Sequence, residues 1–450
     1  MTERSIQLPP PVAALLARLS AAGFAAYAVG GCVRDSLLGE QPKDWDVCTE
    51  ATPEQICACF ERTVCTGLRY GTVTVLWQEG AYEVTTFRTE AAYSDGRHPD
   101  DVRFVRSLRE DLSRRDFTIN AMAAGGDGRV IDPFGGAEDL RRGVLRCVGC
   151  AEARFSEDAL RIVRALRFSA RFGFPLEAQT AAAVHAQKER LRAVAVERIG
   201  KELCGILEGR EAARVLAEFS DVLFTILPEL RPMEGFCQYN HHHAYDVWRH
   251  TLAVVAAAPP ELRLAALLHD CGKPTAFSFD KQLVGHFYDH AVIGAAMTED
   301  ILRRLRFDSK TVRFTSELVR LHDCDLPTTQ RGVRRALSRW SAPMLRALTL
   351  LRFADRLGTG VQQPDAARRD QLLSWIETTQ CLTLRDLAIH GDDLLALGFP
   401  AGPALGALLK ALLDAVLSQS VPNERQALIA YAQNVRDSGK GMIDNLTKEG

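Results

Sequence analysis

The stretch VGGCVRDSLLGEQPKDWDV, residues 29–47, decides how the N-terminal third of the chain folds. Apolar runs at its two ends predict strands, and residues 32–38 between them predict a helix. The glycine pair Gly30-Gly31 lets the backbone approach a bulky group, and the N–H groups that open the following helix can hold phosphate. Arg34 lies one turn into that helix and is expected to reach the same anion.

Two acidic residues, Asp44 and Asp46, close the stretch. In a strand, residues i and i+2 face the same side, so their carboxylates are expected to lie together. Two carboxylates this close repel each other unless a cation joins them, and Mg²⁺ binds one or two carboxylates together with phosphate oxygens. The combination predicts a site for a nucleoside triphosphate with Mg²⁺; the alternative interpretation is a solvated surface turn.

Periodicity predicts an alternating α/β head with a small mixed sheet, followed by helices almost to the C-terminus. The expected head elements are helices at 11–22, 32–38 and 53–60, the last with Thr52 as N-cap, and strands at 24–29, 45–48, 71–77 and 82–88. From about residue 150 the strand signals end. At 450 residues the chain is expected to form two to four domains.

Charge and cysteine usage limit the functional classes. The formal net charge is -2, but residues 101–172 carry 14 arginines, no lysine and 11 acidic residues. Arginine clustering favours bidentate recognition of phosphates or base edges, although part of the bias reflects a chain with few lysines throughout. With no signal peptide and no apolar run of membrane length, the 12 cysteines are interpreted as reduced thiols in the cytoplasm.

A carboxylate and a guanidinium three residues apart, Asp158 and Arg161, have the chemistry to read a base. On a helix the two would share a face. Asp158 accepts hydrogen bonds and Arg161 donates them, which matches the amino group and adjacent ring nitrogen of cytosine or adenine. Guanine and uracil present a carbonyl to the carboxylate instead. The pair therefore predicts selection of C and A without a nucleic-acid template; the alternative is an ordinary helical ion pair.

Five motifs in order give the chain a specific resemblance. The glycine stretch with KDWDV is followed by FRTE at 87–90, RRDFTINAM at 114–122, DPFGG at 132–136 and EDALRIVRALRF at 157–168. Over roughly the first 210 residues the sequence resembles the class II nucleotidyltransferases of the DNA polymerase β superfamily. Within these it is similar to the CCA-adding tRNA nucleotidyltransferases and the related bacterial poly(A) polymerases.

The resemblance implies roles for individual residues. Asp44 and Asp46 would be catalytic and would bind Mg²⁺ with Glu83 as a third ligand. Gly31 and Arg34 would bind the nucleotide, and Asp158 and Arg161 would read its base. The triphosphate or the rest of the nucleotide pocket would be held by Arg115, Arg164 and Arg167. The implied reaction is attack of the tRNA 3′-hydroxyl on the α-phosphate of CTP or ATP, with pyrophosphate as the leaving group.

A second constellation lies in the helical part, where most of the histidines fall between His241 and His322. It resembles the HD-domain metal-dependent phosphohydrolases. That resemblance implies a site for Mn, Fe, Ni or Co formed by His250, His269, Asp270 and Asp355, with His290 and His322 as further candidates. Lys273 would meet a substrate phosphate. The alternative is a fold that keeps the helices and has lost catalysis.

The motifs together predict four parts: a nucleotidyltransferase head at 1–148, a helical neck that binds RNA and nucleotide at 149–235, an HD domain at 236–360, and a helical C-terminal body and tail at 361–450. The expected partners are tRNA, CTP and ATP, with no membrane; the sequence leaves the oligomeric state open. Alternative functions are a bacterial poly(A) polymerase, a CC-only tRNA nucleotidyltransferase, a phosphohydrolase acting on RNA ends or nucleotides, and a non-catalytic RNA-binding protein.

Overall fold

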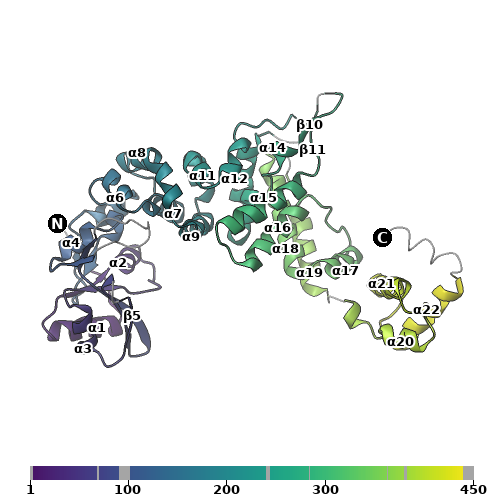
Figure 1. Cartoon of the computed structure of the whole chain (residues 1–450), viewed down its shortest axis with the longest axis horizontal. Helices are drawn as coiled ribbons and strands as arrows, with labels where there is room; N and C mark the ends of the chain where they lie inside the picture. The colour runs from purple at the N-terminus through teal and green to yellow at the C-terminus, as the bar shows by residue number, and fades with distance from the viewer. Residues whose placement is uncertain are drawn as a thin grey trace. The chain divides into compact units, whose positions relative to one another are not determined.

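The structure, a computed structural model, describes residues 4–67, 70–90, 102–239, 244–282, 284–361, 363–379 and 383–438. The chain divides into two compact units, labelled by element in Figure 1. Unit 1 comprises Met1–Glu234 and Asp300–Asp308, and unit 2 comprises Gly235–Glu299 and Ser309–Gly450. The finer division into four parts stays a prediction.

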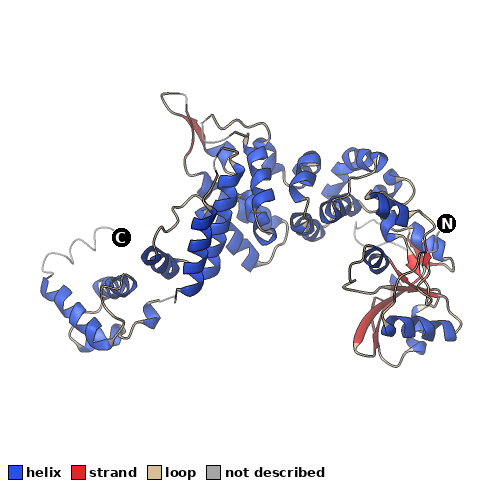
Figure 2. Cartoon of the chain, turned by 180° about the vertical axis from the view of Figure 1, so that it is seen from behind, coloured by secondary structure: helices blue, strands red, loops and turns tan. Residues whose placement is uncertain are grey.

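Unit 1 contains a seven-stranded mixed sheet in the order β3-β4-β5-β2-β1-β8-β9. Among its strand pairs only β2 and β5 run parallel. This sheet confirms the predicted α/β head, and Figure 2 shows that most strands lie in this part of the chain. The strands are β1 (Ala26–Val29), β2 (Val47–Thr49), β3 (Thr63–Gly67), β4 (Thr72–Trp77), β5 (Gly80–Thr86), β8 (Ala123–Ala124) and β9 (Val130–Ile131), and beside the sheet β6 (Arg88–Glu90) pairs with β7 (Val102–Phe104).

The helices of the head begin where local signals place them. The apolar face of α1 is buried through Val12, Leu15, Leu16 and Leu19. Thr52 and Gln55 form a reciprocal capping box at the start of α3, as the predicted N-cap requires. The helices are α1 (Pro10–Ala21), α2 (Gly31–Leu37), α3 (Pro53–Cys59), α4 (Leu108–Ser113) and α5 (Gly136–Arg142), with a 3₁₀ turn η2 (Thr118–Asn120).

The rest of unit 1 is helical. Helix α7 packs against α9 and α10, and its Phe168 and Phe172 rings stack with centroids 5.9 Å apart. Helix α7 carries most of the arginine-rich motif at 157–168. The elements of this part are α6 (Ala151–Glu157), α7 (Leu160–Phe172), α8 (Ala178–Gln187), η3 (Lys188–Ala193), α9 (Val196–Glu208), α10 (Ala212–Glu218), α11 (Ser220–Ile226) and η4 (Pro228–Met233).

The helices after residue 246 place the second set of candidate residues. Helix α12 packs closely on α18. At their contact a Cβ added to Gly358 would lie only 2.5 Å from Val254 Cγ2, so the close approach depends on this glycine. Helix α13 contacts α12, α16 and α18. The elements are α12 (Val247–Ala257), η5 (Pro260–Leu262), α13 (Arg263–Leu268), α14 (Lys273–Ala276), α15 (His290–Arg304), α16 (Ser309–Leu321), α17 (Gln330–Arg339) and α18 (Ala342–Gly358), with a hairpin of β10 (Phe277–Phe279) and β11 (Gly285–Phe287). The hairpin is a departure from the predicted all-helical body.

The C-terminal part has small cores of its own. Leu345 and Leu372 join α18 to α19 in one cluster, and Leu394, Leu412 and Leu428 form another. The elements are α19 (Ala366–Thr378), η6 (Leu384–Asp386), α20 (Gly391–Ala396), α21 (Pro403–Leu417) and α22 (Arg425–Ser438). In the described ranges we find no helix with the length and apolar character needed to span a bilayer.

Candidate functional site

The glycine turn joins β1 to α2, and arginine side chains lie against both of its glycines. Gly30 has a φ of +80°, and a Cβ there would lie 2.9 Å from Arg115 Nη1. A Cβ at Gly31 would lie 3.5 Å from Arg34 Nη2. The positive φ and the close guanidinium explain why position 30 requires glycine. Two of the predicted nucleotide-binding arginines therefore lie beside this turn.

Arg34 and Arg115 differ in how many of their N–H donors are already bonded within the protein. Arg34 is buried, donates to Asp35 Oδ1 at 2.8 Å and to Asn120 Oδ1, and lies over the Phe172 ring. Burial lowers the pKa of Arg34 from its usual value, and Asp35 opposes that effect. Arg115 pairs with Asp111 at 3.3 Å, but its buried Nε has no hydrogen-bond partner among the described residues. Arg115 is therefore the better placed of the two to bind an anion.

The predicted carboxylates Asp44, Asp46 and Glu83 lie near the parallel pair of strands. Strand β2 begins at Val47, so the expectation that both aspartates lie within a strand was wrong. The pairing of β2 with β1 does not extend before Val47, because β1 ends at Val29 and the chain turns at Gly30. Val47 nevertheless pairs with Val84 of β5, so the residues just before them, Asp46 and Glu83, are brought to neighbouring positions.

Electrostatics supports the proximity of the three acidic groups. Partial burial raises the pKa of Asp46, and the negative charges of Glu83 and Asp44 raise it further, whereas Arg115 acts in the opposite direction. Such mutual repulsion is what a bound divalent cation relieves. In the described part of the chain, two groups of three ligand atoms lie within 4.8 Å of one another, and neither contains these carboxylates.

Asp158 lies at a break between two helices. We expected Asp158 and Arg161 to share one helix face, and this was wrong. Helix α6 ends at Glu157, and Asp158 is extended, with φ of -139° and ψ of 104°. Its Oδ1 accepts from the backbone N–H of Leu160 at 3.0 Å. That hydrogen bond favours the break, since a short acidic side chain competes with helical bonding.

Both members of the predicted base-reading pair are buried and bound to protein groups. Asp158 is 8% exposed and accepts from Arg198 Nη2 of α9 at 3.0 Å. Arg161 is 7% exposed and donates to Glu157 Oε2 at 2.8 Å and to the Arg114 carbonyl at 2.8 Å. No direct contact between Asp158 and Arg161 side chains is found in the described structure. The two groups are fixed separately, at the start of the same helix.

The remaining two arginines of α7 are held by acidic residues that the sequence analysis did not single out. Arg164 donates twice to Asp116 Oδ2, at 2.9 and 2.7 Å. Although burial opposes it, the Arg164 charge together with Asn120 lowers the pKa of Asp116 to about 2. Arg167 donates to Glu202 Oε2 at 2.5 Å and lies over Phe168.

The sequence contained a signal for only some of these supporting residues. Asp116 and Asn120 belong to the RRDFTINAM motif that was quoted for the resemblance, and Asn120 also donates to Asp116 at 3.0 Å. Arg198 and Glu202 are four residues apart on α9; Arg198 pairs with Asp158 just before α7, and Glu202 pairs with Arg167 of α7. Their spacing predicts one helix face but does not predict which helix they meet.

Unit 2 brings the six predicted metal ligands together from separate elements. His250 comes from α12 and Asp355 from α18. His269 and Asp270 follow α13, His290 begins α15, and His322 follows α16. Most of them are fully or nearly fully buried. The helical packing therefore assembles in space a set that spans more than one hundred residues of sequence.

Asp270 occupies the middle of this His/Asp centre. Its Oδ2 lies 3.3 Å from His250 Nε2 and 3.2 Å from His269 Nε2. Its Oδ1 lies 3.7 Å from the Nε2 atoms of both His290 and His322. One carboxylate thus faces a histidine pair with each oxygen, and both groups have the spacing of metal ligands.

Asp355 completes the first of these groups. Its Oδ1 lies 3.1 Å from His250 Nε2 and 3.8 Å from His269 Nε2. The paired histidines lower the pKa of Asp355 below its ordinary range, and Asp270 and Asp355 raise the pKa of His250 to about 9, against the effect of burial. The distances therefore place Asp355 beside the first histidine pair, as the predicted ligand set requires.

The orientation of the rings tests whether these residues fit a metal. Nδ1 of His290 bonds the Phe287 carbonyl at 2.8 Å, and Nδ1 of His322 bonds the Val319 carbonyl at 2.6 Å. A carbonyl accepts, so Nδ1 carries the proton and a neutral ring has its lone pair on Nε2. The two Nε2 atoms lie 3.3 Å apart. Two lone pairs at that distance repel unless a proton or a cation lies with them, so the donor set fits a divalent metal.

Lys273 lies inside the centre rather than at its edge. Its Nζ is 2.8 Å from Asp270 Oδ2 and 2.9 Å from Gln238 Oε1, and the residue is buried. The predicted contact with a substrate phosphate stays a prediction. In the structure the lysine neutralises the carboxylate that the histidines share.

Three family models match the chain. Residues 26–146 match the Poly A polymerase head domain, and residues 173–233 match the probable RNA and SrmB-binding site of polymerase A. Residues 286–432 match a model described as tRNA nucleotidyltransferase domain 2, putative. The matches cover the sheet, the helices from α8 to η4 and much of unit 2, and they leave out α6, α7 and residues 234–285.

Two relatives that align over nearly the whole chain carry the same name. A protein of Lactiplantibacillus plantarum named CCA-adding enzyme is 35% identical over 94% of this chain and 96% of its own. One of Geobacillus thermodenitrificans, also a CCA-adding enzyme, is 36% identical over 93% and 95%. The structure is similar to that of the Bacillus stearothermophilus CCA-adding enzyme in complex with CTP, with a TM-score of 0.72, 29% identity and coverage of 96% and 99%. The Thermotoga maritima CCA-adding enzyme complexed with tRNA shares the fold, with a TM-score of 0.59, 20% identity and coverage of 97% and 100%.

Proposed function

The chain belongs to the family of CCA-adding enzymes, and from that premise we propose that it adds C, C and A to the 3′ end of tRNA from CTP and ATP. No nucleic-acid template takes part, and pyrophosphate is released. The observation that supports this most is the neighbouring placement of Asp46 and Glu83 at the parallel strand pair, near the glycine turn and Arg115. Since tRNA and both nucleotides occur in the cytoplasm, we place the enzyme there.

The chemistry rests on positioning and charge. CCA-adding enzymes are nucleotidyltransferases that use a divalent metal, and Mg²⁺ suits a site of carboxylate oxygens and phosphates. Bound by Asp44 and Asp46, with Glu83 as third ligand, it would lower the pKa of the attacking hydroxyl and neutralise phosphate charge. Arg115 would hold the triphosphate beside the glycine turn. The 3′-hydroxyl then forms a bond to the α-phosphorus, the bond to the leaving pyrophosphate breaks, and the hydroxyl proton goes to solvent.

The nucleotide would be selected at the start of α7. Asp158 would accept from the amino group of cytosine or adenine, and Arg161 would donate to the adjacent ring nitrogen. The burial of both residues makes a mismatched carbonyl costly, on the order of 1–3 kcal/mol. Arg164 and Arg167 would line the same pocket, held by their acidic partners.

The products formed on a tRNA without its terminus test this function. CTP alone should give addition of two C residues, ATP alone should give none, and both together should give CCA. A long A tail from ATP alone would identify a poly(A) polymerase instead. Arrest after CC with both nucleotides present would identify a CC-only enzyme; the segment that bears on this alternative, residues 91–101, lies outside the described residues.

A second candidate activity belongs to the His/Asp centre. We propose that it binds a transition metal such as Mn, Fe, Ni or Co and hydrolyses phosphate esters, because Asp270 faces two histidine pairs at ligand spacing. Metal analysis of the purified chain tests the first part, and hydrolysis of p-nitrophenyl phosphate tests the second. A chain with no transition metal, after growth with each of the four, would refute the proposal.

A further inference from the structure

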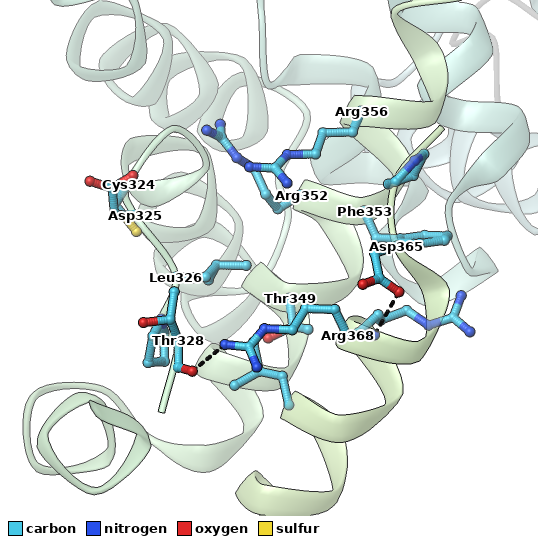
Figure 3. Close-up of a pocket in the computed structure, with 14 residues that line it drawn as sticks. Cys324, Asp325, Leu326, Thr328, Thr349, Arg352, Phe353, Arg356, Asp365 and Arg368 are labelled. Atoms are coloured by element: carbon cyan, nitrogen blue, oxygen red, sulfur yellow. Dashed lines mark hydrogen bonds between the residues drawn. The ribbon is translucent and has the colours of Figure 1, made fainter. Parts of the chain in front are cut away.

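A cavity of about 230 Å³ lies beside the His/Asp centre, and neither activity proposed above assigns it a ligand. Its walls come from the loop at 324–328, from α18, and from the start of α19 with the residues before it. Figure 3 shows Arg352 and Arg356 at one end of the cavity and Arg368 at the other. All of these residues belong to unit 2.

The lining of the cavity is rich in arginine. It includes four arginines, namely Arg352, Arg356, Arg368 and Arg369, and two aspartates, a net charge of +2. One of the aspartates, Asp365, is already occupied as the N-cap of α19, where it accepts from the backbone N–H of Arg368 at 3.0 Å. A phosphate monoester carries a charge of about −1.5 to −2 near pH 7 and has three acceptor oxygens, so it can bind more than one guanidinium at once.

The arginines differ in how fully they are used within the protein. Arg352 pairs with Asp323 at 2.7 Å. Arg369 pairs with Asp370 at 2.8 Å and lies over Phe353. For Arg356, one turn after Arg352 on α18, no ion pair is found in the described ranges. Like charges four residues apart on a helix repel, so an anion held between Arg352 and Arg356 would relieve that repulsion.

The rest of the wall is apolar. Leu326, Pro327, Phe353 and Leu372 line the cavity, and Leu372 also belongs to the hydrophobic core beneath it. A cavity with charged donors at one end and apolar walls elsewhere is typical of small-molecule sites. Its volume is somewhat below the range of about 300–1,000 Å³ for such sites, so the ligand is small.

We propose that this cavity binds a small phosphorylated molecule of mononucleotide size, whose phosphate is held by Arg352 and Arg356 and whose organic group lies on the apolar wall. The proposal does not depend on CCA addition or on metal in the His/Asp centre. It does connect to that centre, because Arg352 also donates to the His322 carbonyl at 3.3 Å and lies 3.8 Å from Asp355 Oδ2.

Local hydrogen–deuterium exchange tests the proposal on the full-length protein. The probes are AMP, inorganic phosphate and adenosine, and the readout is protection of peptides that contain residues 324–328 and 363–372. A local readout separates this cavity from nucleotide binding in unit 1. AMP should protect both peptides, inorganic phosphate should do so only at higher concentration, and adenosine should not.

Charge reversal at Arg356 supplies the decisive variant. Arg356 is exposed, so Arg356→Glu should fold normally, and the apparent Kd for AMP should rise about ten-fold or more. Arg335→Glu on α17, exposed and outside the cavity lining, is the matched control and should bind AMP like the parent chain. Equal protection in Arg356→Glu, protection by adenosine as strong as by AMP, or no protection by millimolar AMP would each overturn the proposal. Inorganic phosphate acting as well as AMP would overturn the assignment to a mononucleotide.

Discussion

Replacing Asp158 by asparagine should change which base the enzyme accepts, and not only how fast it works. The carboxylate accepts at both oxygens, whereas the amide of the asparagine side chain offers an N–H₂ donor as well. That donor matches O4 of uracil. Asp158→Asn should therefore lower kcat/KM for CTP and raise it for UTP.

The structure sets the size of the effect. Asp158 is 8% exposed and fixed by the Leu160 N–H and by Arg198, so it does not turn away from a mismatched base. An unsatisfied buried polar contact costs on the order of 1–3 kcal/mol, and 1.4 kcal/mol is a factor of ten. We expect the ratio of kcat/KM for CTP over UTP to fall by about ten-fold or more.

Single-nucleotide incorporation into tRNA that lacks its terminus measures both constants. Arg198→Ala is the matched control: it removes one of the two groups that hold Asp158 but keeps the carboxylate, so it should relax the CTP over UTP ratio much less than Asp158→Asn does. If Asp158→Asn still rejects UTP as strongly as the parent, or if Arg198→Ala relaxes the ratio just as much, Asp158 is not the group that reads the base.

Three further predictions concern separate parts of the molecule. Asp46→Asn should reduce kcat/KM for CTP roughly 10³-fold while tRNA binding persists, and normal addition by this variant would show that Asp46 is not catalytic. Glu83→Gln should raise the Mg²⁺ concentration needed for the half-maximal rate. His269→Ala should abolish transition-metal binding, measured by elemental analysis, yet spare CCA addition, and loss of addition by a folded variant would contradict this independence. Asp116→Asn should destabilise unit 1 by about 2 kcal/mol at pH 7, because Arg164 holds the pKa of Asp116 at about 2 in the folded chain against about 3.8 unfolded. Ionised Asp116 stabilises the fold fully above about pH 4, and this stabilisation is lost as the pH falls toward 2 and the carboxylate is protonated. The difference in unfolding midpoint between the parent and Asp116→Asn should therefore shrink between about pH 4 and pH 2.

Local signals predicted the elements that depend on local chemistry. Helix α1 follows from one apolar face, and α3 follows from the Thr52 cap. Strands β8 and β9 have only two residues each; β8 forms by pairing with β1 and β9 by pairing with β8, so no property of their own sequence predicts them. The same limit explains β2, which starts two residues later than expected because its partner turns away at Gly30.

The site was predictable as a set of residues and not as a set of contacts. The motifs placed Asp158 and Arg161 at the start of a helix, and the ligands of the His/Asp centre in one group. They did not show that Asp158 pairs with Arg198, which lies forty residues along the chain on another helix. Nor did they show that Asp270 faces two histidine pairs, since that depends on how α13, α15 and α16 pack.

The energetic cost of the His/Asp centre bears on why the chain retains it. His250, His269 and Asp270 are almost fully buried among the helices that form the core of unit 2. Burying ionisable groups costs several kcal/mol each, and well-packed apolar side chains in their place would often be more stabilising. In unit 1 the buried Asp116 pairs with the guanidinium of Arg164. In the centre the histidine Nε2 atoms instead converge on one another and on a single shared carboxylate. Burial of several ionisable groups around one shared carboxylate costs stability, and this cost favours the proposal that a cation binds at the centre.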